Sequence, residues 1–342
     1  MDFVKDMCEK ARLMQKKLVL AEGTEPRTIK AARILTDKKL ASNVSLVGKA
    51  DDVKAVAAKE GVNLEGVNIV DPSTSPSLDK YAVEYFNLCH KKEEAKIKKG
   101  QEIKKPITME RAKTEIMTQL RWGAMMVHLG DADAMVAGAE NATADVLRAG
   151  IAIVGTVSRT ASSCFVVQTA DQMWGIDGAL IFSDCAVIPE PTEEQLADIA
   201  VSAAQSCREF LNAEPAVALL SFSTKGSASH DAVTKVQKAV EILKERNLDF
   251  VFDGDLQADA ALVPSVTDKK APCSPIKGKT NTLVFPNLSA GNIGYKLVQR
   301  LGKAEAFGPF LQGFSKPISD LSRGASVDDI VVTAAVTLGR AK

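Results

Sequence analysis

The sequence lacks most of the short motifs that mark common enzyme classes. It has no G-x-x-x-x-G-K-[ST] loop for nucleoside triphosphates, no G-x-G-x-x-G turn after the first apolar run and no G-x-S-x-G nucleophile elbow. The three histidines, His90, His128 and His230, are scattered and show no H-E-x-x-H or H-x-x-x-H spacing. These absences disfavour an ATPase, a nicotinamide-dependent dehydrogenase, a Ser-His-Asp hydrolase and a zinc enzyme.

Net charge and long apolar runs are also missing. The 43 Lys and Arg residues balance 43 Asp and Glu residues, so no global field attracts nucleic acid or an anionic membrane. No stretch of about 18 apolar residues occurs, which predicts neither secretion nor insertion into a membrane. The six cysteines form no C-x-x-C pair, which is typical of reducing cytoplasm. We therefore expect a cytoplasmic protein.

What is present is an alternation of short apolar runs with longer segments of helical period. At 342 residues the chain exceeds the usual size of one hydrophobic core, so we expect two domains. In the first half the predicted strands are KLVLAE, NVSLVG, VNIVDP and ADAMVAGA, with helices from Thr28, Asp51, Ser77 and Glu110. This order predicts α/β units with parallel strands.

The pattern restarts after about residue 159. The predicted strands of this half are SSCFVVQTA, GALIFSD, AVALLSFS, LDFVFDG and NTLVFP, separated by long helices such as TEEQLADIAVSAAQSCREFL. We interpret VPSVTDKKAPCSPIKGK as a long basic loop, and we expect the segment after about residue 310 to pack back on the first domain. The expected domains are therefore 1–158 plus 310–342, and 159–309.

The turn DLSRGASVDDI, Asp320 to Ile330, joins a helix cap to an arginine. Ser326 and Asp329 have the spacing of a capping box at the start of the last helix. Arg323 stands just before that helix N-terminus, where a guanidinium and backbone N–H groups bind a tetrahedral oxyanion such as phosphate. A surface arginine paired with Asp320 explains the same residue equally well.

Three further turns have the form of a strand followed by a polar turn and a helix. GAENATADVLRAG places Thr143 and Arg148 after a predicted strand, as an anion site or as an N-cap beside a solvated arginine. SFSTKGSA offers Ser223 and Lys225 as phosphate ligands. In the third turn, Lys296 and Arg300 share a helix face, a spacing that is usually just a solvated face.

Three aspartates follow another predicted strand, in FDGDLQADAAL. A divalent metal site formed by Asp253, Asp255 and Asp259 is conceivable, because carboxylates suit hard cations. No histidine or bidentate glutamate stands nearby, so we predict no metal.

Together, these segments resemble the phosphate acetyltransferase (phosphotransacetylase) family. The resemblance runs from about Lys17 to the C-terminus. It rests on LVLAEGTEPRTIKAARIL, VAGAENATADVLRAGIAIVG, SFSTKGSA, DGDLQADAALVP, FPNLSAGNIGYKLVQRLGKAEAFGP and QGFSKPISDLSRGASVDDIV in that order. It implies reversible transfer of acetyl between coenzyme A and inorganic phosphate, with CoA as a substrate and no tightly bound cofactor. It also implies two α/β domains like those of isocitrate and isopropylmalate dehydrogenases, with a cleft between them, and a homodimer.

The resemblance also assigns roles to residues. Arg323 matches the family arginine that binds phosphoryl and acetyl oxygens, Ser322 its neighbouring serine, and Asp329 the aspartate proposed to take the CoA thiol proton. Arg148 matches another active-site arginine. Asn292, Lys296 and Arg300 fall where the family binds CoA.

Two departures from the family pattern affect this transfer of roles. LCHKK, at 88–92, replaces a stretch in which the family has an arginine, so that contact is missing here or is supplied by a lysine. Gln172 or Met173 stands where some members have a cysteine, which argues against an acetyl-cysteine intermediate. Direct transfer in a ternary complex is the simpler hypothesis.

Alternatives remain at this stage. A longer acyl group would make the chain a phosphate butyryl- or propionyltransferase, because one methylene changes binding by only about 1–3 kcal/mol. A non-catalytic acyl-CoA-sensing module is the alternative from another class. Ordinary carboxyl and thiol pKa values differ by about 4–5 units, so the role of Asp329 is either that of a base or that of an orienting group.

Overall fold

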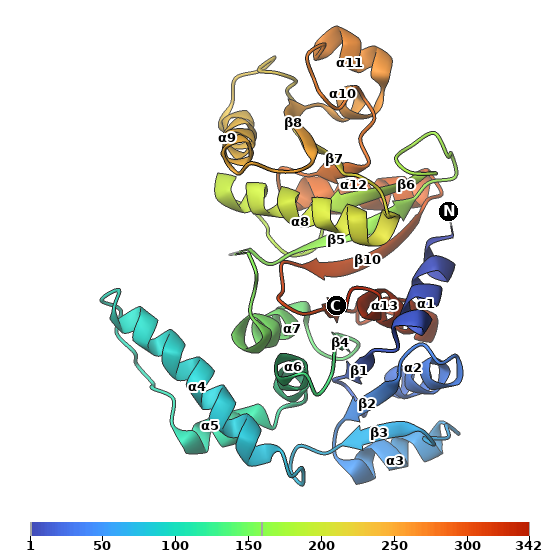
Figure 1. Ribbon diagram of the computed structural model, residues 1–342, viewed down its shortest axis with the longest axis vertical. Coiled ribbons are helices and arrows are strands. Elements are labelled where there is room, and N and C mark those ends of the chain that lie inside the picture. The colour runs from blue at the N-terminus through green and yellow to red at the C-terminus, as the bar shows by residue number, and fades with distance from the viewer. Residues whose placement is uncertain (1, 159, 342) are drawn as a thin grey trace. The chain divides into compact units, whose positions relative to one another are not determined.

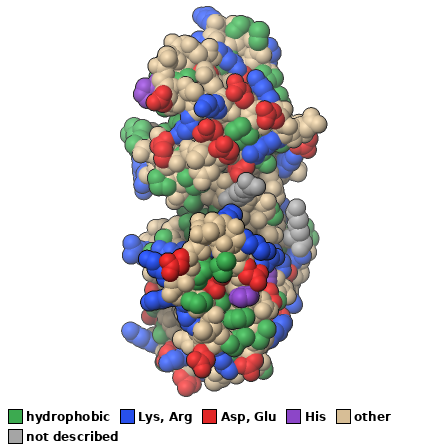
Figure 2. Space-filling view, turned by 90° about the vertical axis from the view of Figure 1, so that its left-hand side faces the viewer, with side chains coloured by type: hydrophobic (Ala, Val, Ile, Leu, Met, Phe, Trp, Pro, Cys, Tyr) green, Lys and Arg blue, Asp and Glu red, His purple; other side chains and the backbone are tan. Residues whose placement is uncertain are grey.

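The computed structural model describes residues 2–158 and 160–341. The chain divides into two compact units, each built around one sheet (Figure 1). Unit 1 comprises Met1–Phe3 and Thr156–Gly313, and unit 2 comprises Val4–Gly155 and Phe314–Lys342. In the part of the chain that the structure describes, no helix is both long and apolar enough to cross a membrane. Figure 2 shows basic and acidic side chains interspersed over the face in view, as expected from the balanced composition.

Unit 2 has a five-stranded parallel sheet in the order β11-β4-β1-β2-β3. Its strands are β1 (Lys17–Leu20), β2 (Asn43–Val47), β3 (Val67–Val70), β4 (Ala134–Ala137) and β11 (Ile318–Asp320). Its helices are α1 (Phe3–Met14), α2 (Pro26–Asp37), α3 (Ala50–Lys59), α4 (Leu78–Ile97), α5 (Met109–Ile116), α6 (Gln119–Leu129), α7 (Thr143–Ala149), the π-helix η1 (Gly150–Val154) and α13 (Val327–Leu338). The four strands predicted for this half are confirmed.

The core of unit 2 explains why its strands are apolar runs. Helices cover both faces of a parallel sheet, so few strand positions need to be polar. On one face, Leu18 and Leu20 of β1 belong to the same buried cluster as Ile29 of α2 and Ile330 of α13. The C-terminal segment thus completes this unit by adding strand β11 and helix α13.

Unit 1 has a six-stranded mixed sheet in the order β10-β5-β6-β9-β7-β8. Its strands are β5 (Ser162–Gln168), β6 (Ala179–Ser183), β7 (Ala216–Leu220), β8 (Val251–Leu256), β9 (Thr282–Val284) and β10 (Glu305–Gln312). Its helices are α8 (Glu193–Leu211), α9 (Asp231–Glu245), α10 (Ala258–Leu262), α11 (Pro264–Lys270) and α12 (Leu288–Leu301). All five strands predicted for this half are confirmed.

Three details of the sequence-based prediction are wrong. The expectation of parallel strands fails at one edge of the unit 1 sheet, where β5 pairs antiparallel with both β6 and β10. The segment read as a long basic loop contains the short helix α11, which begins at Pro264, because proline suits the first turn of a helix. The helix predicted from Glu110 is two helices, α5 and α6, separated at Met117–Thr118.

Candidate active site

Three neighbouring strands of unit 2, β11, β4 and β1, end at one edge of its sheet. The residues that follow them are Leu321–Ser326, Gly138–Asn141 and Ala21–Glu22. In open α/β sheets, ligands bind outside the carboxyl ends of the strands. This edge carries Ser322 and Arg323, and the helices that leave it carry Thr143, Arg148 and Asp329.

Glu22, two residues after β1, organises the loop that follows β4. Its carboxylate is almost completely buried and accepts hydrogen bonds from the backbone N–H groups of Gly138, Ala139, Glu140 and Asn141 at 2.8–3.1 Å. The side-chain amide of Asn141 donates a fifth bond at 2.8 Å. Such a set satisfies a buried carboxylate and fixes the loop, since each bond to a charged group contributes about 1.5–3 kcal/mol.

Arg27, at the start of α2, ties the Arg323 loop to the same framework. Its guanidinium donates to the carbonyl oxygens of Arg323 and Ala325 at 2.8 and 2.7 Å, and to that of Ala139 at 2.9 Å. Glu25 pairs with its Nε at 2.7 Å. One side chain therefore holds the loops after β4 and β11 together. Sequence reasoning assigned no role to Glu22 or Arg27, although both lie in one of the segments that carry the family resemblance.

Asp320, the last residue of β11, is buried and binds Thr143. The hydroxyl of Thr143 lies 2.5 Å from Oδ2 of Asp320. Burial raises the pKa of Asp320 to about 6; the hydrogen bond from Thr143 opposes this rise, and the nearby charge of Glu22 adds to it. The interpretation of Arg323 as a surface arginine paired with Asp320 is therefore wrong, and so is that of Thr143 as the N-cap, because Ala142 occupies the cap position.

The close approach of the loops requires glycine at position 138. Gly138 has a φ of +109°, and a Cβ there would lie 2.4 Å from Oδ1 of Asp320 and 2.6 Å from the backbone nitrogen of Leu321. That nitrogen donates to the carbonyl of Ala137 and so continues the pairing of β11 with β4. A side chain at 138 would separate the two loops.

The guanidinium of Arg323 is exposed and has no hydrogen bond or ion pair with the residues that the structure describes, although its backbone is held by Arg27. The neighbouring Ser322 hydroxyl accepts a bond from the N–H of Gly324 at 3.3 Å. A fixed backbone with an unpaired cation is an arrangement suited to binding an anion.

Asp329 serves as half of the helix cap. Its Oδ2 accepts bonds from the N–H and the hydroxyl of Ser326, both at 2.8 Å, and Ser326 Oγ accepts from the N–H of Asp329 at 3.1 Å. The predicted capping box of α13 is thus confirmed. Asp329 itself is exposed, and its second oxygen, Oδ1, has no hydrogen bond among the residues that the structure describes.

Arg148 lines a pocket of about 590 Å³ in unit 2. Its guanidinium pairs with Asp145 one helical turn earlier, and the pocket also contains Asn141 and Arg121. Arg121, which sequence reasoning did not single out, lies with its guanidinium carbon 6.0 Å from the ring centre of Tyr85. Two guanidiniums with one carboxylate leave the pocket with an excess of positive charge.

Of the two lysines in the stretch LCHKK, Lys92 is held by backbone carbonyl groups. Lys92 donates to the carbonyls of Ile151 and Ala152 at 3.1 and 2.7 Å, and so satisfies the end of η1. Burial lowers the pKa of Lys92. Arg121 is the cation that lines the Arg148 pocket.

The other predicted ligands lie in unit 1. Lys225 pairs with Asp253 and donates to the carbonyl of Gly254 at 3.0 Å, while Ser223 Oγ accepts from the N–H of Ala228. On α12, Asn292 donates to the carbonyl of Cys185 at 3.1 Å. Lys296 and Arg300 are exposed on that helix, with Lys296 5.8 Å from the ring centre of Tyr295.

The aspartates considered for a metal have other partners. Asp253 pairs with Lys225, and Asp259 pairs with Lys270 at 2.8 Å. Asp255 accepts from the N–H of Gly226, and its hydrogen bonds keep its pKa low in spite of burial.

Comparison with known proteins agrees with this geometry. The family model described as phosphate acetyl/butaryl transferase matches residues 2–338. The chain is 55% identical over 343 residues to a phosphate acetyltransferase of Treponema pallidum, covering 99% of this chain and 98% of that protein. It is 46% identical to a phosphate acetyltransferase of Thermoanaerobacterium thermosaccharolyticum over the full length of both.

A solved structure of a phosphotransacetylase has a similar fold. A phosphotransacetylase from Streptococcus pyogenes superposes with a TM-score of 0.88 at 36% identity, covering 99% of this chain and 98% of that one. The mixed α/β architecture, the match over nearly the whole chain and the full-length relatives lead to one assignment: the chain belongs to the phosphate acetyl/butaryl transferase family.

Proposed function

We propose that this chain is a phosphate acetyltransferase that interconverts acetyl-CoA plus phosphate and acetyl phosphate plus CoA. The observation that carries the proposal is the Arg323 loop, whose backbone Arg27 fixes while the guanidinium keeps no partner among the described residues. Relatives that share the full length of the chain bear the name of this activity. The assay that tests it combines acetyl phosphate with CoA and follows thioester formation.

The proposed chemistry is direct transfer in a ternary complex. The CoA sulfur attacks the carbonyl carbon of acetyl phosphate, a C–S bond forms, and the C–O bond to phosphate breaks. The thiol proton passes to a base, and phosphate leaves with the electron pair of the broken bond. Arg323 and Ser322 stabilise the tetrahedral oxyanion, a contribution of about 3–4 kcal/mol per donor. In the reverse direction, phosphate attacks the thioester.

Thr143 and Arg148 are proposed to hold the phosphoryl group in unit 2. When Asp320 is ionised, the Thr143 hydroxyl donates a hydrogen bond to Asp320, so it can only accept a hydrogen bond from a ligand. When Asp320 is protonated, it donates to Thr143 instead and frees that hydroxyl to bind an anion. Because burial raises the pKa of Asp320 to about 6, we expect the direction of this hydrogen bond to reverse near that pH.

Asp329→Asn tests whether Asp329 moves a proton. We expect CoA to bind nearly as before and turnover to fall about 100-fold, since a general base contributes about 10²–10⁴. Steady-state kinetics with acetyl phosphate and CoA measure this. Asp328→Asn, in the same exposed first turn of α13, is the matched control and keeps near-normal turnover. Near-normal turnover of Asp329→Asn would reject the base and leave Asp329 as a cap worth about 1 kcal/mol.

Two groups of residues in unit 1 are also part of the proposal. Ser223 and Lys225 are proposed to bind phosphate. Asn292, Lys296 and Arg300 are proposed to bind CoA. Lys296 and Arg300 are exposed cations one turn apart, which suits contacts with the phosphates of CoA. Measuring the KM for CoA in an Arg300→Ala variant tests this, and an unchanged KM would remove Arg300 from the CoA site.

A homodimer is part of the proposal. Helix α12 exposes Ile293, Leu297 and Leu301, spaced four residues apart, with exposed fractions of 58%, 52% and 79%. Exposed apolar stripes of this kind mark interaction sites. Sedimentation velocity separates dimer from monomer, and a purely monomeric chain at micromolar concentration would contradict this part.

The remaining parts of the proposal come from the sequence. These are a cytoplasmic location, domains at 1–158 plus 310–342 and at 159–309, and an isocitrate/isopropylmalate dehydrogenase-like arrangement. Acetyl is the proposed acyl group. Butyryl and propionyl transfer are the alternatives within the family, and an acyl-CoA sensor without turnover is the alternative outside it.

A further inference from the structure

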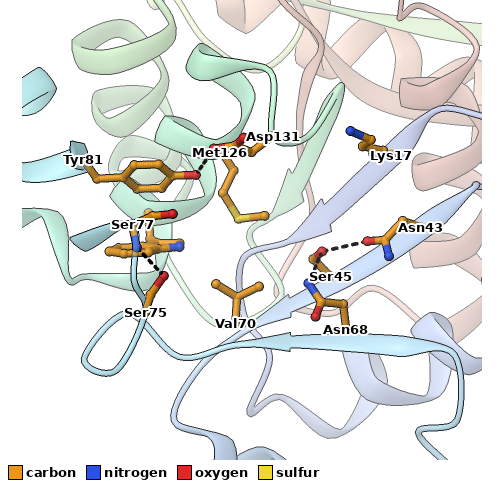
Figure 3. Close-up of a pocket in the computed structure, with 11 residues that line it drawn as sticks. Lys17, Asn43, Ser45, Asn68, Val70, Ser75, Ser77, Tyr81, Met126 and Asp131 are labelled. Carbon is orange, nitrogen blue, oxygen red and sulfur yellow. Dashed lines mark hydrogen bonds between the residues drawn. The ribbon is translucent and has the colours of Figure 1, made fainter. Parts of the chain in front are cut away.

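A second pocket of unit 2, of about 390 Å³, extends from the first residues of β1 and β2 to Val70, the last residue of β3. Lys17 and Asn43 are the first residues of β1 and β2, and Asp131 stands just before β4 (Figure 3). The candidate catalytic loops follow the carboxyl ends of these strands, and the Arg148 pocket has an entirely different lining. The second pocket is therefore separate from the site described above.

A chain of polar side chains crosses the floor of this pocket. Ser45 and Asn68 are register neighbours on β2 and β3, and the Asn68 amide donates to Ser45 Oγ at 3.2 Å. The Ser45 hydroxyl in turn donates to the side-chain amide oxygen, Oδ1, of Asn43 at 3.0 Å (Figure 3). Within residues 2–158 and 160–341, the amide nitrogen of Asn43 and the carbonyl oxygen of Asn68 have no side-chain partner. Both side chains are exposed, so these two groups are open to hydrogen bonds with a molecule in the pocket.

The aromatic wall of the pocket carries a buried donor that lacks an acceptor. Trp122 is only 1% exposed and lines the pocket, yet its indole N–H has no hydrogen-bond partner in the described part of the chain. Its ring lies 4.6 Å, centre to centre, from that of Tyr81, whose hydroxyl donates to Asp131 at 2.5 Å. Buried indole N–H groups normally find an acceptor, so this one points to a ligand.

The charges and hydroxyls of the pocket indicate what that ligand is. One cation, Lys17, and one anion, Asp131, line it, so the pocket has no excess charge. The remaining polar lining consists of amides and of the hydroxyls of Ser45, Ser75 and Ser77. Groups that both donate and accept, beside aromatic rings, match neighbouring hydroxyls on a small ring.

We propose that this pocket binds a small neutral polyhydroxylated molecule of the monosaccharide or cyclic polyol class. The Trp122 indole and the Asn43 amide donate to its hydroxyl oxygens, while Asn68 and Asp131 accept from its hydroxyl groups. The proposal does not depend on the acetyl transfer proposed for the Arg323 site.

The NMR signal of the Trp122 indole N–H reports whether a molecule binds in the pocket. The chain has two tryptophans, so a ¹H–¹⁵N spectrum shows two indole signals, and Trp174→Phe assigns them. D-ribose, D-glucose and myo-inositol are titrated separately to high millimolar concentration, with sodium acetate, inorganic phosphate and glycine as charged comparisons. We expect a saturable shift of the Trp122 signal with at least one neutral probe, and none of Trp174. No saturable shift with any neutral probe, or an equal one with acetate, phosphate or glycine, would overturn the proposal.

Two variants keep the test specific. Asn68→Val removes one acceptor from the floor with a side chain that suits a strand, and Ser45→Ala breaks the same chain of bonds with a smaller change. Each is expected to weaken binding of the active probe about tenfold while acetyl transfer stays unchanged. Asn63→Ala, which removes an amide outside the pocket, is the control and binds as wild type does. Unweakened binding in both floor variants would contradict the assigned site.

Discussion

Arg323→Ala is expected to lower kcat for thioester formation about 100- to 1,000-fold, the loss that follows removal of one oxyanion donor. The guanidinium is exposed and unpaired among the described residues, so its removal should leave the fold intact. The backbone carbonyl of Arg323 that Arg27 binds is kept in the variant. The loss should therefore appear in turnover rather than in thermal stability.

A second variant separates charge from geometry at this position, and a third, at another exposed arginine, is the control. Arg323→Lys keeps the charge but loses the two-pronged donor, so we expect it to recover only a small part of the lost rate. Arg12→Ala, on α1, removes another exposed arginine of unit 2, whose guanidinium donates to the backbone carbonyl of Lys38, and should leave kcat unchanged. If Arg323→Ala retained more than half of the wild-type kcat, Arg323 would have no catalytic role.

Glu22→Gln is expected to loosen the loop after β4 and to reduce turnover with it. The amide replaces one carboxylate oxygen with a donor that faces backbone N–H groups, which cannot accept from it. A cost of about 2–4 kcal/mol follows from the broken charge-assisted bonds. Amide hydrogen exchange at Gly138–Asn141 should accelerate about 30- to 1,000-fold, which is the same free energy expressed as a rate.

The matched control for this prediction is Glu65→Gln, an exposed glutamate of the same unit. It should leave exchange at Gly138–Asn141 and turnover as in the wild type. Unchanged exchange in Glu22→Gln would show that the five bonds to Glu22 do not hold the loop.

The sequence predicted most strands because parallel strands covered on both faces are apolar runs. β10 and β11 were missed for a physical reason. β10 contains Gly308 and Pro309 and its register with β5 is interrupted there, so its sequence reads as a turn. β11 has only three residues and follows Pro317, and it becomes a strand only because β4 offers it a partner.

The site was predictable only in part. Ser326 and Asp329 obey a local capping rule, so the sequence alone identified their bonds. The role of Glu22 depends on a loop more than 110 residues away, and that of Arg27 on a loop almost 300 residues away. No local pattern contains such contacts. The local signal for Glu22 was a charged residue two positions after the buried strand β1.

Thioester formation by the purified chain tests the central claim most directly. Acetyl phosphate, propionyl phosphate and butyryl phosphate are each mixed with CoA, and the thioester absorbance is followed beside an Arg323→Ala control. We predict rapid formation of acetyl-CoA, slower reaction of the longer acyl phosphates and strong loss in the variant. A chain that binds CoA but forms no thioester from any of the three would contradict the account and favour an acyl-CoA sensor.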